Sequence, residues 1–130
     1  MSVAIYIVCE REVEGTDTFV DGKALGHVDP DVLASIETRL GVTPMYDMIS
    51  ADPEEIGEFF EGVDDAEIPP ETWYPASKGL ETVRALRAHL AENPSGLGNA
   101  AAVIEDLDDF ERLLRYLDAN EVRFHFAMDF

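Results

Sequence analysis

The spacing of apolar residues changes along this chain, and each change marks the boundary of a predicted element. Ser2–Cys9 (SVAIYIVC) is a continuous apolar run rich in β-branched residues, which is typical of a strand buried on both faces. Val122–Phe130 alternates strictly between apolar and polar residues, which predicts a half-buried strand. Because these runs lie at the two ends of the chain, we expect them to pair in the centre of a sheet.

Four stretches between these strands have apolar residues at every third or fourth position, which predicts four helices. The first is capped by Asp29 and ends at Gly41, and the second covers Asp52–Glu61. Ser77 and Asn99 are the predicted caps of the third and fourth helices.

Two shorter segments complete the predicted sheet. The Asp21–Gly22 pair lies between Thr18–Val20 and Lys23–Leu25, a pattern typical of a tight hairpin with positive φ at its two central residues. Val42–Ser50 is predicted to be an edge strand, since Pro44 cannot donate a hydrogen bond to a ladder.

These elements predict one α+β domain that spans residues 1–130. We expect a small mixed sheet that includes both terminal strands, with about four helices packed mainly on one side. A three-layer α/β arrangement is the alternative. The length of 130 residues and the hydrophobic content of 46% both fit a single core.

The charge of the chain restricts its partners. It has 28 Asp and Glu against 9 Lys and Arg, a formal net charge of -19. Nucleic acid and anionic membranes would be repelled, whereas a basic protein or a cation would be attracted. No basic residue occurs between Arg39 and Lys78, where Asp64 and Asp65 are candidate binding residues. The same acidity is also expected of a solvated surface or of adaptation to a salty cytoplasm.

Cysteine usage and the lack of long apolar runs indicate the compartment. The single Cys9 excludes an internal disulfide and favours a reducing environment. No apolar run approaches the ~18 residues that cross a bilayer, and the N-terminus lacks a basic region before its apolar run. We therefore expect a cytoplasmic protein. No zinc or calcium spacing is present, so no metal or cofactor is predicted.

The polar face of the last strand carries the candidate catalytic residues Arg123, His125 and Asp129. An arginine beside a histidine can bind a carboxylate or phosphate, and the histidine can transfer a proton near neutral pH. The same pattern fits a solvated face, or one whose charges are paired. If the terminal strands pair, Cys9 could approach His125 and form a thiolate, although a cysteine in an apolar strand is more often inert.

Trp73 and Tyr74 form a second group of candidate binding residues, flanked by Pro70 and Pro75. They lie in a stretch, Val63–Pro75, that is predicted to be an ordered surface loop. Aromatic side chains on a rigid loop can anchor a partner. The alternative is that Trp73 fills the core beneath the loop.

Four segments together resemble a group of small uncharacterised bacterial cytosolic proteins. They are Asp17–Leu25, Ala51–Glu55, Trp73–Leu80 and Val122–Phe130. The resemblance covers most of the chain. It implies a bacterial cytoplasmic setting and a domain of mixed helices and strands, and it implies no activity.

The leading functional hypothesis is a non-enzymatic protein-interaction or regulatory module that binds a basic partner, as an immunity or inhibitor protein does. A small enzyme or ligand-binding protein that uses the polar face of the last strand is the alternative. A third reading is that the acidity only adapts a housekeeping protein to salt, which can coexist with either. A homodimer through a sheet edge or the long fourth helix stays open.

Overall fold

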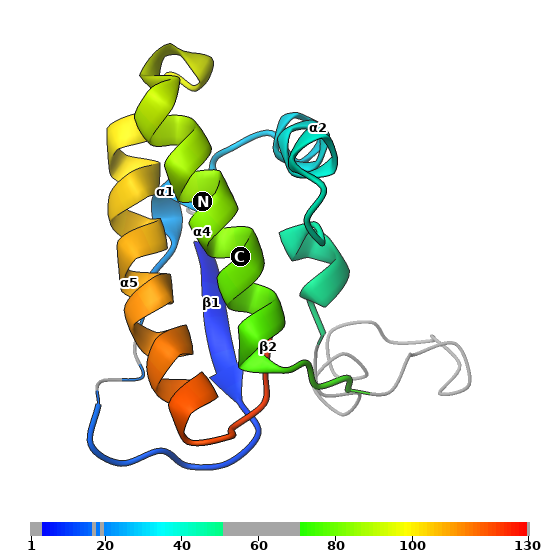
Figure 1. Cartoon of the computed structure of the whole chain (residues 1–130), viewed down its shortest axis with the longest axis vertical. Coiled ribbons are helices and arrows are strands. Elements are labelled where there is room, and N and C mark those ends of the chain that lie inside the picture. Colours follow the sequence, from blue (N-terminus) through cyan, green and yellow to red (C-terminus); the bar gives the residue numbers. More distant parts are fainter. Residues whose placement is uncertain (1–3, 17, 19, 51–70, 130) are drawn as a thin grey trace.

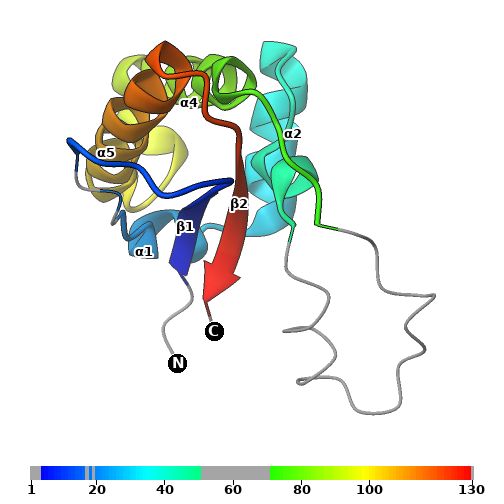
Figure 2. The same cartoon turned by 90° about the horizontal axis from the view of Figure 1, so that it is seen from below.

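The two ends of the chain lie side by side in a two-stranded antiparallel sheet. The computed structural model describes residues 4–16, 18, 20–50 and 71–129. Strand β1 (Ala4–Cys9) pairs with strand β2 (Phe124–Asp129) along their whole lengths (Figure 2). The predicted α+β class and the pairing of the terminal strands are confirmed.

Four α-helices occur among the described residues. They are α1 (Lys23–Gly26), α2 (Pro30–Leu40), α4 (Ala76–Glu92) and α5 (Ala100–Ala119), and two 3-10 turns, η1 (Met45–Met48) and η3 (Pro94–Gly96), accompany them. Helices α4 and α5 pack along each other over one face of the sheet, and α2 lies to the other side of α4 (Figure 1). The helix predicted over 52–61 and the loop predicted over 63–75, apart from its last five residues, lie outside the described residues.

The helical periodicity of the sequence is confirmed where the structure describes it. The apolar stripe of α5 is buried along its length and consists of Val103, Leu107, Phe110, Leu114 and Leu117. Helix α2 begins where the Asp29 carboxylate accepts a hydrogen bond from the Asp31 N–H at 2.8 Å. It ends at Gly41, whose φ of 73° is the left-handed conformation that glycine adopts most readily.

The core lies between the sheet and the helices α4 and α5. Alternate residues of β2 supply Phe124 and Phe126, whose rings meet edge to face at a centroid distance of 5.0 Å. Phe110 of α5 lies 5.8 Å from the Phe126 ring. Full burial of such a side chain contributes about 1.5–3 kcal/mol relative to leaving it exposed. The apolar half of the alternating pattern therefore faces the helices.

The predicted hairpin around the Asp21–Gly22 pair is wrong, because Lys23–Gly26 forms α1 instead. Gly22 has a φ of -87°, so it does not adopt the positive φ that the turn would need. Its N–H and C=O bond to Ile5 on the outer edge of β1, at 2.9 and 3.2 Å. The helical turn buries Leu25 completely and brings the Leu25 N–H to the Asp106 carboxylate, a partner far along the chain.

The predicted edge strand over Val42–Ser50 is also wrong, because Met45–Met48 forms η1. Met45 and Met48 are both fully buried, and their spacing of three would place them on opposite faces of a strand. A tight helical turn directs both into the core. The segment still reaches the sheet, since the Ser50 N–H donates to the Phe126 carbonyl at 3.0 Å.

Two predicted helix caps differ in detail. Helix α4 begins at Ala76, so Pro75 and not Ser77 occupies its cap position, and Ala76 is buried. Asn99 occupies the cap of α5 as predicted, but its side-chain amide donates to the Ala24 carbonyl at 3.2 Å instead of capping the helix. Tertiary contacts with α1 therefore take the place of a local cap.

Gly79 allows α4 to approach the sheet closely. A Cβ atom at this position would fall inside contact distance of the Phe124 ring and would lie 3.2 Å from a methyl group of Leu114. Both neighbours are fully buried, so neither can move aside without disturbing the core. We expect Gly79→Ala to lower the free energy of unfolding by about 1–3 kcal/mol, measured by urea denaturation.

The matched control is Gly98→Ala, where a Cβ atom meets nothing within 4 Å. This change should alter stability by less than about 1 kcal/mol. Alanine favours a helix over glycine by about 1 kcal/mol, so a Gly79→Ala variant that is more stable than the parent would contradict the close packing.

Candidate functional site

His125 of β2 lies on the face of the sheet opposite the core helices, and its side chain is only 1% exposed. Its Nε2 lies 2.7 Å from a Glu71 carboxylate oxygen, and its Nδ1 lies 2.9 Å from the Phe126 carbonyl oxygen. Both partners are acceptors. A ring with hydrogen on both nitrogens donates to both partners, whereas a neutral ring donates to only one.

Trp73 packs against the His125 ring, with a centroid distance of 4.7 Å and an interplanar angle of 41°. Glu71 and Trp73 reach β2 because Tyr74 is bridged to the outer edge of that strand. The Tyr74 N–H donates to the Phe124 carbonyl at 2.7 Å, and the Phe124 N–H donates to the Tyr74 carbonyl at 2.9 Å. Glu71, Trp73 and His125 are called the His125 cluster below.

Of the other two candidate catalytic residues, Arg123 is paired outside this cluster, and Asp129 is placed only by its position in β2. The Arg123 guanidinium donates to a Glu10 carboxylate oxygen at 2.8 Å, and the Arg123 N–H donates to the other oxygen at 3.0 Å. These bonds hold the pKa of Glu10 below its ordinary value. Asp129 ends β2, opposite Ala4. The structure thus joins Trp73 to His125 and pairs Arg123 elsewhere.

The candidate binding residues differ in their surroundings. The Tyr74 hydroxyl donates to the Asp47 carbonyl at 3.1 Å, and the Lys78 ammonium lies 5.6 Å from the centre of the Tyr74 ring. Trp73 and Tyr74 are both half-buried. Asp64 and Asp65 lie outside the described residues, so their part in binding stays a prediction.

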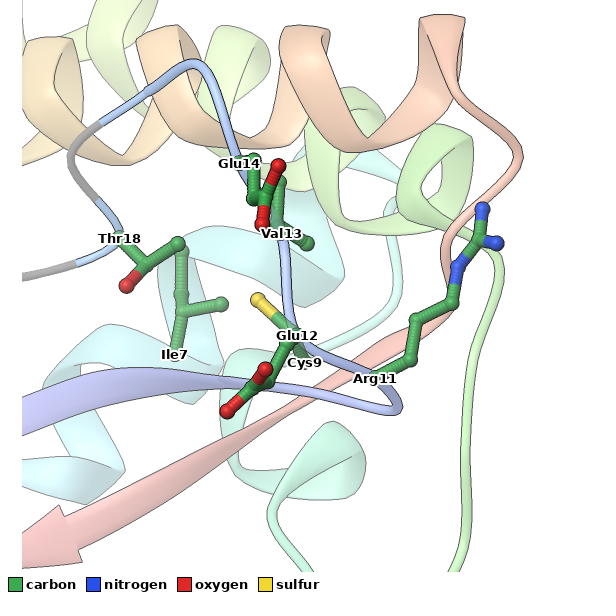
Figure 3. A pocket seen from close by; sticks show the side chains of 7 residues that line it. All are labelled: Ile7, Cys9, Arg11, Glu12, Val13, Glu14 and Thr18. Carbon is green, nitrogen blue, oxygen red and sulfur yellow. The ribbon is translucent and has the colours of Figure 1, made fainter.

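Cys9 and His125 do not form the suggested pair. The strand register places Cys9 opposite Phe124 and His125 opposite Val8, so the two side chains lie on opposite faces of the sheet. Burial also raises the pKa of the Cys9 thiol, which disfavours the thiolate. Cys9 instead lines an open pocket of about 520 Å³ beside β1, together with residues of the segment that follows it (Figure 3).

The part of the chain that the structure describes contains neither a metal-binding cluster nor a membrane-spanning helix. Within it, no group of three or more His, Cys, Asp or Glu side chains is placed to hold a metal ion. None of its helices combines the length and the apolar character that crossing a membrane requires.

Glu37 is a buried carboxyl group that the sequence analysis did not single out. Its side chain is 0% exposed, and one oxygen accepts a hydrogen bond from the Met45 N–H at 2.7 Å. Among the described residues, the other oxygen has no hydrogen-bond partner, and neither does the buried Tyr46 hydroxyl. Burial, with a smaller contribution from the nearby Asp47 carboxylate, raises the pKa of Glu37 to about 7.

Asp106 of α5, like Glu37, is a carboxyl group that accepts a hydrogen bond from the backbone of another element. Its carboxylate accepts a hydrogen bond from the Leu25 N–H at 3.1 Å, and burial raises its pKa. The sequence position of Asp106 indicates this burial, because Asp106 lies three residues after Val103 and four before Phe110, within the apolar stripe. Glu37 likewise lies four residues after Leu33. A carboxyl group at a stripe position indicates a buried hydrogen bond and not solvent.

No protein-family model, curated protein or solved structure matches this chain. The function is therefore inferred from the residues and contacts of the chain itself.

The bond between Glu71 and His125 should contribute measurably to stability. In Glu71→Gln the carboxylate is lost, so the buried ring keeps a neutral acceptor in place of a charged one. We expect the free energy of unfolding to fall by about 1–2 kcal/mol in urea denaturation. The control Glu81→Gln removes the same charge from an exposed position and should change stability by less than about 0.5 kcal/mol. Equal effects of the two substitutions would show that the bond is not formed.

Glu37 should make stability depend on pH in a defined direction. Because its folded pKa of about 7 exceeds the ordinary value of 4.5, the folded chain binds more protons between these values than the unfolded chain. The contribution of Glu37 to stability is therefore greatest below pH 4.5 and falls as the pH rises to about 7. Relative to the parent, Glu37→Gln should gain about 1–3 kcal/mol between pH 5 and pH 8 in urea unfolding. A difference that stays constant across this range would contradict the assignment.

Proposed function

We propose that this chain is a non-enzymatic protein-interaction module that binds a basic protein through its carboxylates, in the manner of an immunity or inhibitor protein. The observation that carries the proposal is the way the few cations are used. Among the described residues, Lys23, Arg84, Arg87 and Arg123 form ion pairs with carboxylates of the same chain, which has 9 Lys and Arg in all.

In the part of the chain that the structure describes, most exposed carboxylates therefore have no ion pair with a cation of the chain. Arg84 and Arg87 of α4 pair with Glu111 and Asp108 of α5, so both arginines of α4 are paired inside the helix pair. Within the same described ranges, the exposed carboxylates for which no ion pair is described are Glu12, Glu14, Asp29, Asp31, Asp47, Glu81, Glu92, Glu105, Asp109, Asp118 and Glu121. A basic partner would find these groups available and would be steered toward them over a distance of about 10 Å at moderate salt.

The burial of the His125 cluster favours this function over a small enzyme or ligand-binding protein on the same strand. A general acid or base has to reach the group with which it exchanges a proton. The His125 ring is 1% exposed, and both of its nitrogens already have partners within the chain. The cluster supports a structural role, in which Glu71 and Trp73 are attached to β2.

The proposal can be tested by capture of partners from a lysate of the native host at 0.05 and 0.5 M KCl, followed by titration of the purified partner. We expect a basic protein whose affinity falls steeply with salt, because screening weakens exposed ion pairs. Affinity that is unchanged at 0.5 M KCl would exclude docking through carboxylates.

A pair of matched variants locates the docking surface. Asp64→Asn with Asp65→Asn removes two charges from the segment that has no basic residue, and Asp109→Asn with Asp118→Asn removes two from the exposed face of α5. The first variant should weaken binding of the purified partner by about fivefold, and the second by less than about twofold. Equal losses would mean that only the net charge matters, which contradicts a defined docking segment.

A further inference from the structure

Within the part of the chain that the structure describes, the outer edge of β1 has a backbone partner at Ile5 and none at Ile7 or Cys9. Ile5 directs its N–H and C=O away from β2 and bonds with both to Gly22. Because backbone groups two residues apart in a strand point the same way, those of Ile7 and Cys9 face this same outer edge. Among the described residues, none donates to or accepts from these groups of Ile7 and Cys9. The outer edge of β2, by contrast, is occupied by Tyr74 at Phe124 and by Ser50 at Phe126.

The part of the edge formed by Ile7 and Cys9 borders the pocket of about 520 Å³. Ile7 and Cys9 of β1 line it together with Glu12, Val13, Glu14 and Thr18 of the following segment (Figure 3). The pocket thus combines backbone donors and acceptors that have no partner among the described residues with an apolar surface made by Ile7, Cys9 and Val13. An added strand uses both features, since its backbone bonds to the edge while alternate side chains enter the pocket.

The charges around the pocket determine which kind of added strand would be attracted to it. Arg11 also lines it, but its side chain extends away from Cys9, and its guanidinium donates to the Asn120 carbonyl at 2.8 Å (Figure 3). Glu12 and Glu14 are exposed, and no ion pair is described for either. A second copy of this chain would bring its own Glu12 and Glu14 and its net charge of -19 to the same place. Like-charge repulsion disfavours that copy and favours a basic segment.

We infer that the edge formed by Ile7 and Cys9 is a docking site for an extended basic peptide segment, which adds to β1 as a further strand. Its backbone pairs with Ile7 and Cys9, and its apolar side chains contact Val13. Its basic side chains lie beside Glu12 and Glu14. This inference rests on the proposed function and specifies where, and in which conformation, the basic partner is bound.

The test uses the whole chain, labelled for NMR, and three synthetic peptides of about eight residues. The first alternates Lys and Val, the second alternates Glu and Val, and the third is the Lys and Val peptide with every backbone nitrogen methylated. We expect only the first to slow hydrogen exchange of the Ile7 and Cys9 amides and to give cross-strand contacts to them. The methylated peptide keeps the charge and loses the backbone donors, so it separates strand addition from charge attraction alone.

Matched variants check the charges. Glu12→Gln with Glu14→Gln should weaken binding of the Lys and Val peptide by about fivefold, whereas Glu81→Gln with Glu92→Gln, on exposed positions of α4, should weaken it by less than about twofold. Because all four positions are exposed, each variant is expected to fold. Equal losses in the two variants would overturn the assignment of the site.

Other outcomes overturn the inference in separate ways. Binding of the peptide without change at Ile7 and Cys9 places it elsewhere. If the Ile7 and Cys9 amides are already protected from exchange without peptide, another segment occupies the edge. That segment belongs to a second copy of the chain if protection rises with protein concentration, and to the same chain if it does not. A salt-sensitive basic partner that leaves these amides unchanged would leave the proposed function in place and remove only this site. If the peptide protects these amides but no salt-sensitive basic partner is found, the docking site stands and the proposed function is contradicted.

Discussion

The antiparallel pairing of β1 with β2 is the interaction on which the rest of the structure depends. It joins Ala4 to Asp129, so it closes almost the entire chain into one loop. Its register places Phe124 and Phe126 against α4 and α5, and it places His125 on the opposite face. A slip of one residue would exchange these faces. The irregular segments then attach to its two outer edges, at Gly22 on β1 and at Ser50 and Tyr74 on β2.

Hydrogen bonds from buried or partly buried polar side chains attach the irregular segments to the sheet and the helices that pack on it. Glu37 bonds to the first residue of η1, Asp106 bonds to α1, and His125 bonds to Glu71. Glu37 and His125 are buried and Asp106 is partly buried next to apolar residues, where a polar group without a hydrogen bond is costly. In the part of the chain that the structure describes, the second oxygen of Glu37 has no hydrogen-bond partner, and burial raises the pKa of the Glu37 carboxyl group to about 7. Stability at neutral pH is thus set partly by groups that in sequence look like surface acids.

The acidic surface and the outer edge of β1 are physically connected. An unpaired edge invites pairing between copies of a chain, and charged residues beside it oppose that pairing. Glu12 and Glu14 lie beside the part of the β1 edge that has no partner among the described residues, on a chain with a net charge of -19. The same charges that separate two copies of this chain attract a basic segment. The proposed function and the proposed docking site therefore follow from one property, an excess of carboxylates that the few cations of the chain do not neutralise.

The sequence by itself determined the elements whose side chains repeat with a clear period. The strands at the two ends, the helices α2, α4 and α5, and the α+β class all follow from local patterns of apolar residues and from caps such as Asp29. Only the tertiary structure decided the short segments and the site. Lys23–Gly26 and Met45–Met48 became helical because Leu25, Met45 and Met48 are buried against distant elements, which local propensity does not contain. The His125 cluster joins residues 71 and 125, and the alternation that predicted a polar face could not reveal that Trp73 and Glu71 would cover it. Period and charge are properties of neighbours in sequence, whereas burial and pairing depend on which distant residues come together.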